Sequence, residues 1–326
     1  MWLNYALFAV GLVLLIKGGD WFVDGATGIA KRFHLPEILI GATVVSIGTT
    51  LPEVMVSATS AVSGHSEIAY GNAIGSIICN TALISALTIA IRPSKVDKAS
   101  LRIPVIFFFI AAAFYLAIAY TGGYYGRISG VVLLLLFAVY MVVTVKRALD
   151  DSKLSAKEET EKQLEEDEQT PALKNIILLV VGAALIAVGA NLLVNKGTLI
   201  AQHFGVPESV IALTFVALGT SLPELVTAIT ALVKGHGALS LGNIIGANLF
   251  NLVLVSGLSI TLSPFSLPSG KTVGGMNASL VVDTPLMLAV MLILTVPALA
   301  KGKLSRTQGI VLLALYAAFC VFQFAL

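Results

Sequence analysis

Ten apolar segments, each about as long as a lipid bilayer is thick, make up most of the chain. A hydrocarbon core about 30 Å thick requires roughly 20 apolar residues per helix. Of all residues 57% are hydrophobic and only 12% are charged, against about 45–50% and 25% in soluble proteins. We therefore expect an all-α polytopic membrane protein with ten transmembrane helices. The segments lie at about 3–22, 36–63, 68–91, 103–121, 127–146, 173–195, 207–233, 238–262, 280–300 and 307–325.

One polar stretch, residues 150–171, separates the segments into two groups of five. It contains nine of the chain's 18 acidic residues and almost no apolar ones, a composition typical of a solvated, flexible linker. The chain is thus expected to consist of a first half (residues 1–149), this acidic linker, and a second half (residues 172–326).

Lysine and arginine are concentrated in the loops on one side of the predicted spans. That side holds Lys31, Lys301 and most of the others, whereas the opposite side offers little beyond Arg127, Lys196 and Lys271. Because cytoplasmic loops carry the excess of these residues, we expect both termini outside and the linker in the cytoplasm of a plasma membrane protein. The net charge of +2 is too small to indicate nucleic acid as a partner.

The two halves repeat each other at a fixed offset of 171 residues. Between residues 36–53 and 207–224, ten of 18 positions are identical. Each half has five spans, an odd number, so the second half must enter the membrane in the opposite sense. Two inverted five-helix repeats are the usual architecture of secondary transporters, with the substrate near the bilayer midplane.

Two acidic residues stand out within the predicted spans, and they occupy equivalent positions of the repeat. Glu53 ends the segment Gly-Thr-Thr-Leu-Pro-Glu, and Glu224 ends Gly-Thr-Ser-Leu-Pro-Glu. A charged carboxylate at the bilayer centre costs about 2.5–3.5 kcal/mol unless it is paired. No lysine or arginine lies at matching depth in a span, so a bound cation is the simplest partner. A protonated carboxyl bonded to a neighbouring helix is the structural alternative.

Oxygen-bearing residues surround both glutamates. Pro52 and Pro223 each remove a backbone donor, so we expect the two helices to be kinked or broken there, which is tolerated where the backbone lines a cavity. With no sulfur or imidazole among them, these groups favour a hard cation such as sodium or calcium. The hydroxyls are those of Thr43, Ser46, Thr49, Thr50 and Ser57 in the first half, and of Thr214, Thr220 and Ser221 in the second.

The spans that follow present amides at helical spacing. Asn72, Ser76 and Asn80 recur every four residues, as do Asn243, Ala247 and Asn251, so each set shares one helix face. Ordinary hydrogen bonding between helices would explain either face alone. Their repetition after the two glutamates makes ligation the better interpretation.

These paired motifs resemble the two alpha-repeats of sodium/calcium exchangers, in the calcium/cation antiporter superfamily. The similarity covers nearly the whole chain, and the short linker resembles prokaryotic members. It implies an antiporter with no enzymatic activity and no cofactor, whose partners are calcium, sodium and the lipid bilayer, with a monomer as the transport unit. In that family the first and sixth spans are understood to slide across the other eight.

The resemblance also implies roles for individual residues. Glu53 and Glu224 would be the shared central calcium ligands, aided by Thr49 and Thr220. Asn80 and Asn251 would line the middle of the site. The sodium sites would draw on Ser46, Thr50, Ser76, Ala217 and Ser221.

Two departures from the family pattern leave rival functions open. Some members have an aspartate where this chain has Asn251, and Ala247 replaces the hydroxyl that Ser76 provides in the first half. Two carboxylates still neutralise one calcium ion, but sodium binding could be weaker. A proton/calcium antiporter using the same glutamates is therefore the main alternative. A passive cation channel and a membrane scaffold without transport are the others.

Overall fold

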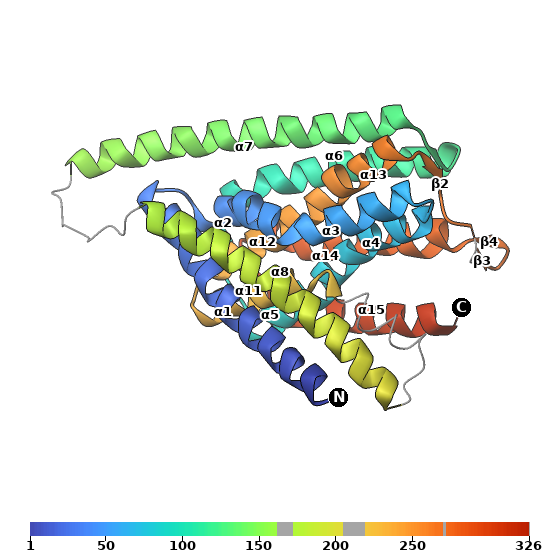
Figure 1. The fold of residues 1–326 in the computed structure, drawn as a ribbon. Helices are drawn as coiled ribbons and strands as arrows, with labels where there is room; N and C mark the ends of the chain where they lie inside the picture. Colours follow the sequence, from blue (N-terminus) through green and yellow to red (C-terminus); the bar gives the residue numbers. More distant parts are fainter. Residues whose placement is uncertain (162–171, 205–218, 270–271, 326) are drawn as a thin grey trace. The chain divides into compact units, whose positions relative to one another are not determined.

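The computed structural model describes residues 1–161, 172–204, 219–269 and 272–325, and these residues are predominantly helical (Figure 1). The first half contains α1 (Trp2–Arg32), α2 (Glu37–Ile40), α3 (Ser46–Val62), α4 (Ser66–Cys79), α5 (Ala86–Ile91), α6 (Lys98–Thr121) and α7 (Arg127–Glu161). The second contains α8 (Ala172–His203), α11 (Leu222–Val233), α12 (Gly237–Phe250), α13 (Ser256–Leu262), α14 (Thr284–Lys301) and α15 (Arg306–Ala325).

Short π-helical segments and strands join several of these helices. The π-helical segments are η1 (Gly41–Val45), η2 (Asn80–Ser85), η4 (Asn251–Val255) and η5 (Ser279–Asp283). The strands β1 (Tyr124–Tyr125) and β2 (Phe265–Ser266) pair antiparallel, as do β3 (Thr272–Val273) and β4 (Met276–Asn277).

Within the described residues, nine helical stretches are long and apolar enough to cross a membrane. They correspond to nine of the ten predicted spans. Part of the remaining one, at 207–233, lies outside the described residues, and its described part is the shorter apolar helix α11. The first helix, α1, extends ten residues beyond the predicted segment 3–22. The prediction of an all-α polytopic membrane protein is confirmed.

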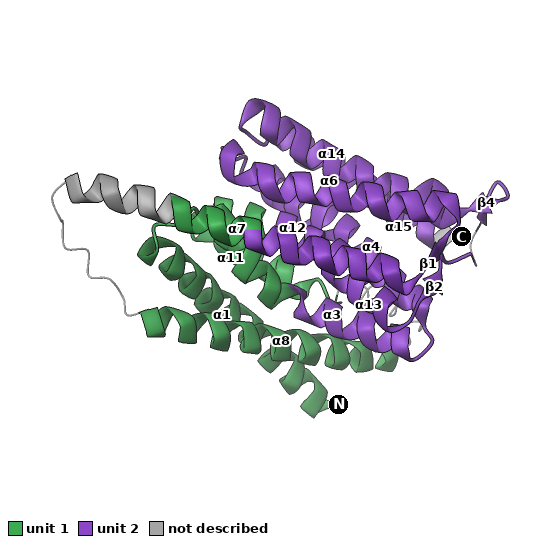
Figure 2. Ribbon diagram, turned by 90° about the horizontal axis from the view of Figure 1, so that it is seen from above, with its two compact units in different colours: residues 1–49, 143–243 green, residues 50–142, 244–326 purple. Residues whose placement is uncertain are grey.

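Two compact units make up the structure, and neither is one half of the sequence. Unit 1 comprises residues 1–49 and 143–243, and unit 2 comprises residues 50–142 and 244–326 (Figure 2). Each unit therefore combines segments from both repeats, and the unit boundaries fall inside the helices α3, α7 and α12. The predicted division into residues 1–149 and 172–326 describes the two repeats of the sequence and not the two compact units. It remains a prediction.

In unit 1 the long helices α1 and α8 lie side by side and touch through glycine (Figures 1 and 2). A Cβ atom added to Gly18 would lie 2.9 Å from the carbonyl oxygen of Gly182, and one added to Gly11 would lie 3.0 Å from that of Gly189. Small residues allow such close packing of helix backbones in lipid.

These glycine contacts are reciprocal in the numbering of the repeat. Gly11 and Gly182 are equivalent positions of the repeat, as are Gly18 and Gly189. In the structure, however, Gly11 contacts Gly189 and Gly18 contacts Gly182. Only an antiparallel crossing about an internal two-fold axis produces this exchange of partners. The contact is thus what inverted repeats require.

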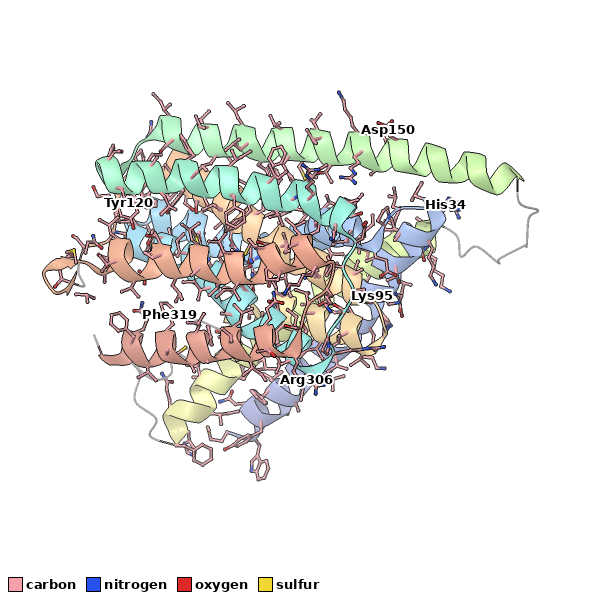
Figure 3. The ribbon with its side chains drawn as sticks, turned by 180° about the vertical axis from the view of Figure 1, so that it is seen from behind. His34, Lys95, Tyr120, Asp150, Arg306 and Phe319 are labelled. Atoms are coloured by element: carbon pink, nitrogen blue, oxygen red, sulfur yellow. The ribbon has the colours of Figure 1, made fainter. Side chains whose placement is uncertain are left out.

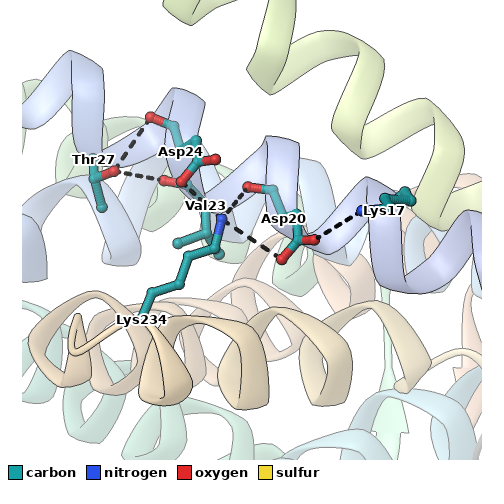
Figure 4. Close-up of polar contacts among 6 residues, drawn as sticks. All are labelled: Lys17, Asp20, Val23, Asp24, Thr27 and Lys234. Carbon is teal, nitrogen blue, oxygen red and sulfur yellow. Dashed lines mark hydrogen bonds and ion pairs between the residues drawn. The ribbon is translucent and has the colours of Figure 1, made fainter.

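Polar contacts tie the middle of α1 to the end of α11 (Figure 4). The Lys234 ammonium lies 2.8 Å from Asp24 Oδ1 and 3.6 Å from Asp20 Oδ1, and it donates to the backbone carbonyl of Asp20. Both aspartates are partly exposed, so each ion pair contributes about 0–1 kcal/mol. Asp20 and Asp24 therefore anchor one helix to another at the surface of unit 1.

Aromatic side chains fill the core of unit 2. Tyr115 and Tyr125 stack with ring centroids 4.5 Å apart, and Phe250 meets Phe137 edge to face at 5.1 Å. The fully buried Tyr140 also contacts Phe250, at 6.0 Å. These contacts fix α12, which carries part of the candidate site, against α7.

The first part of the acidic stretch is helical. Helix α7 continues to Glu161, through the first residues of the predicted linker, and residues 162–171 lie outside the described residues. The linker expected from residue 150 onward therefore begins as a continuation of this helix, and its flexibility stays a prediction. The glutamates, lysines and alanine of this stretch are good helix formers, and the charged pattern alone does not end a helix.

Candidate cation site

Glu53 lies in the interior of α3 and is 0% exposed. The helix is continuous from Ser46 to Val62 with Pro52 inside it, so it is not broken at Pro52, and the alternative of a kink there stays a prediction. The departure from α geometry comes earlier, in the π-helical segment η1, which ends just before Ser46. Proline is tolerated where neighbouring groups satisfy the carbonyl that it leaves free.

Glu224 is equally buried but occupies a different position in its helix. Helix α11 begins at Leu222, with Pro223 in its first turn and residues 220–221 in a turn before it. The interruption expected at Pro223 is therefore present. It places Glu224 in the first turn, where the positive end of the helix dipole stabilises a carboxylate.

The sequence Ser221-x-x-Glu224 also matches a capping box, which would be a purely structural role. However, the Ser221 side chain makes no capping hydrogen bond. Its hydroxyl is buried and has no hydrogen-bond partner among the described residues. This observation disfavours the structural interpretation of the pair. Thr220, next to it, is partly buried, and Ala217 lies outside the described residues.

In unit 1, two predicted ligands lie beside the side-chain amide of one residue, Asn243. Thr49 Oγ1 donates to Asn243 Oδ1 at 3.1 Å, and Ser46 Oγ lies 3.0 Å from the Asn243 carbonyl and 3.3 Å from Oδ1. All three residues are buried. Asn243 therefore accepts from the Thr49 hydroxyl and lies within hydrogen-bond distance of the Ser46 hydroxyl, a role that the sequence interpretation assigned to no residue.

Glycines make this contact possible. A Cβ atom added to Gly242 would lie 2.3 Å from the Ile38 carbonyl oxygen, and one added to Gly41 would lie 2.4 Å from that of Leu239. The start of α12 can thus approach α2 and η1 at backbone distance, which brings Asn243 within reach of α3.

In unit 2, Asn72 binds α4 to α3 beside Glu53. Its Nδ2 donates to the Glu53 backbone carbonyl at 3.2 Å and to Ser57 Oγ at 2.8 Å. Ser57 Oγ lies 3.4 Å from the carbonyl oxygen of Ala69 on α4. These bonds fix the backbone that carries the Glu53 side chain.

Other predicted ligands of unit 2 are buried without such partners. The side chains of Asn80 and Asn251 are 0% exposed, and neither their amide nitrogens nor their amide oxygens have a hydrogen-bond partner among the described residues. The Thr50 hydroxyl is in the same situation, and Ser76 is 4% exposed. Leaving a buried polar group unsatisfied costs about 1–3 kcal/mol. Cation coordination would satisfy the oxygens of this set.

The two asparagines whose side-chain amides are unsatisfied each begin a π-helical segment. Asn80 is the first residue of η2 and Asn251 the first of η4, and the two positions are equivalent in the repeat. Single π-helical turns within α-helices occur frequently at functional sites. Hydrophobic periodicity does not reveal them, and the sequence interpretation missed all of them.

A hydroxyl residue directly after three of these segments compensates for the wider turn. Ser46, Ser256 and Thr284 each donate to the carbonyl oxygen five residues earlier, at 2.8, 3.0 and 3.0 Å. Those oxygens belong to the first residue of η1, η4 and η5, respectively. A serine or threonine at this position is a sequence signal that could have found the segments.

Asn248 is a further buried polar residue that the sequence interpretation missed. Its Nδ2 donates to Thr81 Oγ1 at 2.7 Å, and its Oδ1 has no hydrogen-bond partner among the described residues. Thr81 follows Asn80, and Asn248 precedes Asn251 by about one helical turn. The bond therefore joins the two helical segments that carry the orphaned asparagines. The equivalent position in the first half is Ile77, so the repeat comparison could not have indicated it.

The donor set is chemically uniform. In the described part of the chain, no three histidine, cysteine or acidic side chains gather into a group that could hold a metal ion. The candidate ligands are single carboxylates, amides and hydroxyls, which suit hard cations that bind and leave rather than a tightly held transition metal.

Comparisons with known proteins agree with this chemistry. The family model described as "Sodium/calcium exchanger protein" matches residues 3–146 and 174–325. The sodium/calcium exchanger MaX1 of Methanosarcina acetivorans is 31% identical over 352 residues, covering 98% of both chains. The inner membrane protein YrbG of Escherichia coli is 37% identical over 266 residues, covering 81% of each.

Among solved structures, the fold is similar to that of the sodium-calcium exchanger NCX_Mj. For crystals soaked with 2.5 mM Na⁺ and 0.1 mM Ca²⁺, the TM-score is 0.80 at 32% sequence identity, and the match covers 97% of each chain. At this identity and coverage the similarity extends to the whole helical architecture.

Proposed function

The chain belongs to the sodium/calcium exchanger family, and from that premise we propose that it is an antiporter that exchanges calcium for sodium by alternating access, with Glu53 and Glu224 as the principal cation ligands. The observation that carries the proposal is the burial of both carboxylates at equivalent repeat positions, each within a unit that also buries orphaned hydroxyl or amide groups. The family consists of exchangers, so transport rather than enzymatic chemistry is expected of the chain.

Competition for the same oxygens explains the coupling. Two carboxylates neutralise one calcium ion, and hard-cation ligands of this type also accept sodium. If the same glutamates serve both ions, calcium and sodium cannot be bound fully at once, so one ion displaces the other. Thr49 and Thr220 would assist calcium. Sodium would use Ser46, Thr50, Ser76, Ala217 and Ser221, and Asn80 and Asn251 would supply further oxygens.

Sodium is favoured over protons as the counter-ion. MaX1 and NCX_Mj are named for sodium and calcium, and the hydroxyls near both glutamates would have no ligand to bind in a purely proton-coupled exchanger. Ala247 is buried and supplies no hydroxyl. The missing hydroxyl would change how many sodium ions are carried, and not whether sodium is used.

The proposal is tested by calcium uptake into proteoliposomes that contain the purified chain. We expect an outward sodium gradient to drive uptake, and an outward proton gradient without sodium to drive none. Uptake driven by protons alone would transfer the chain to the proton-coupled type with the same glutamates. Flux that follows the calcium gradient with no dependence on a counter-ion would instead indicate a channel.

Asn243 provides a test of Thr49 as a calcium ligand. Replacement Asn243→Ala removes the side-chain acceptor that orients the Thr49 hydroxyl, so we expect the calcium concentration for half-maximal exchange to rise several-fold. Loss of one such bond corresponds to about 1 kcal/mol, or roughly a fivefold change. Asn4→Ala on the exposed end of α1 is the control. An unchanged calcium dependence would contradict the role proposed for Thr49.

Membrane placement follows from the loop charges. The loops rich in lysine and arginine would lie in the cytoplasm, with residues 150–171 on the same side, both termini outside and a single chain as the transport unit. The expected location is the plasma membrane.

A further inference from the structure

Two loops of unit 2 are joined into one platform at the ends of its helices. We use the term basic platform for residues 92–102 and 301–306. The Val96 amide donates to the Gly302 carbonyl and the Leu304 amide to the Ser94 carbonyl, both at 2.9 Å. Lys95 and Lys303 face each other across this antiparallel bridge. Val96 and Leu304 are buried while the two lysines are exposed, so both ammonium groups are presented outward.

The basic platform carries seven cations and one carboxylate, all on exposed residues. The carboxylate, Asp97, is engaged at the start of α6, where it accepts from the amides of Ala99 and Ser100 at 3.0 and 3.2 Å. It is therefore occupied as a helix cap. The cations are Arg92, Lys95, Lys98, Arg102, Lys301, Lys303 and Arg306.

Two of these cations hold the platform together. Lys98 Nζ donates to the Ala300 carbonyl at 2.6 Å, near the end of α14, and Arg306 Nε donates to the Ala90 carbonyl at 2.9 Å, near the end of α5. The other five are not needed for these caps. Their charge is concentrated on two segments whose backbones are hydrogen-bonded to each other.

The basic platform lies at one end of helices that are long and apolar enough to cross a membrane. It is formed by the starts of α6 and α15 and the end of α14, all of which belong to membrane-spanning stretches. Figure 3 shows Lys95 and Arg306 at one end of these helices and Tyr120 and Phe319 toward the other. At that opposite end, among the described residues of 120–127 and 263–278, the single cation is Arg127.

We propose that the basic platform binds the phosphate headgroups of anionic phospholipids. Lysine and arginine close to an anionic membrane surface are attracted to its phosphates, and five or more of them on one fixed surface can surround a phosphodiester. An acidic peptide would offer the same sign of charge. The lipid is favoured because the platform stands at the ends of three spanning helices, at the depth of the headgroups.

The test measures binding to the full chain without relying on transport. The thermal unfolding midpoint of detergent-solubilised protein is followed while phosphatidylglycerol or phosphatidylcholine is added, since a ligand of the folded state raises the midpoint. We expect phosphatidylglycerol to raise it more than phosphatidylcholine does. The combined variant Lys95→Gln, Arg102→Gln, Lys303→Gln should lose most of that difference and keep the midpoint measured without lipid.

A matched control removes the same charge elsewhere. The combined variant Lys31→Gln, Arg127→Gln, Lys196→Gln should respond to phosphatidylglycerol as the unmodified chain does. Equal responses of both variants would overturn the proposal, because they would show a general effect of net charge. A synthetic peptide of residues 150–171 is added in a parallel titration. Stabilisation by the peptide but not by phosphatidylglycerol would overturn it in favour of an acidic segment.

Discussion

Calcium uptake driven by a sodium gradient should fall at least about 100-fold when either Glu53→Gln or Glu224→Gln is introduced. Glutamine keeps the shape of the side chain but removes its charge, so two sites that are 0% exposed retain their packing while losing a principal ligand. A loss of about 3 kcal/mol in cation binding corresponds to that factor. Radioactive calcium uptake into proteoliposomes with matched protein content measures it.

The control for both variants is Glu67→Gln, which removes a carboxylate from the exposed first turn of α4. Transport by this variant should equal that of the unmodified chain. Thermal unfolding of all three variants separates a lost ligand from a lost fold, and we expect comparable midpoints. Robust residual exchange by Glu53→Gln or Glu224→Gln would refute their assignment as principal ligands.

Sequence alone predicted the architecture well because lipid imposes a simple rule. A spanning helix must be apolar over roughly 20 residues, and nine stretches of the described residues meet that requirement. The repeat, with an odd number of spans in each half, then predicted inversion, and the reciprocal contacts of Gly11 and Gly18 with α8 are those of an inverted pair. The extent of α1 and α7 was not predictable, because helices continue beyond the bilayer wherever local propensity permits.

The candidate site was predicted by residue type and only partly by geometry. Repetition indicated Asn80 and Asn251, and both are buried. It could not show that each begins a π-helical segment, because a single wider turn hardly changes the hydrophobic pattern. It also assigned Asn243 to an amide face, whereas the structure makes its side chain the acceptor for Thr49. Such pairings depend on which helices touch, which the local sequence does not encode.

Proline illustrates the same limit. Pro52 and Pro223 are equivalent in sequence, yet α3 is continuous through Pro52 while α11 begins next to Pro223. The chemistry of proline permits a kink, a break or a first-turn position, and the surrounding helices decide among them. A repeat in sequence therefore predicts equivalent ligands more reliably than equivalent backbone.

Gly18→Val and Gly182→Val should each reduce stability by at least the upper end of the about 1–3 kcal/mol typical of overpacking. A Cβ atom on Gly18 would lie 2.8 Å from the Ile186 amide nitrogen, and one on Gly182 would lie 2.5 Å from that of Phe22. Both clashes are with backbone, which cannot rotate away as a side chain can, so α1 and α8 must separate along their length. Thermal unfolding should show a markedly lower midpoint, and calcium uptake should fall with the amount of folded protein.

Ala9→Val places the same side chain at an exposed position of α1 and should leave the midpoint unchanged. Because both glycines contribute to one crossing, the double variant should cost less than the sum of the two single ones. Once the first valine has separated the helices, the second meets less resistance, and contacting residues are expected to be non-additive. If Gly18→Val unfolded at the same temperature as Ala9→Val, α1 and α8 could not pack through these glycines. The reciprocal contact on which the inverted arrangement of this pair rests would then be wrong.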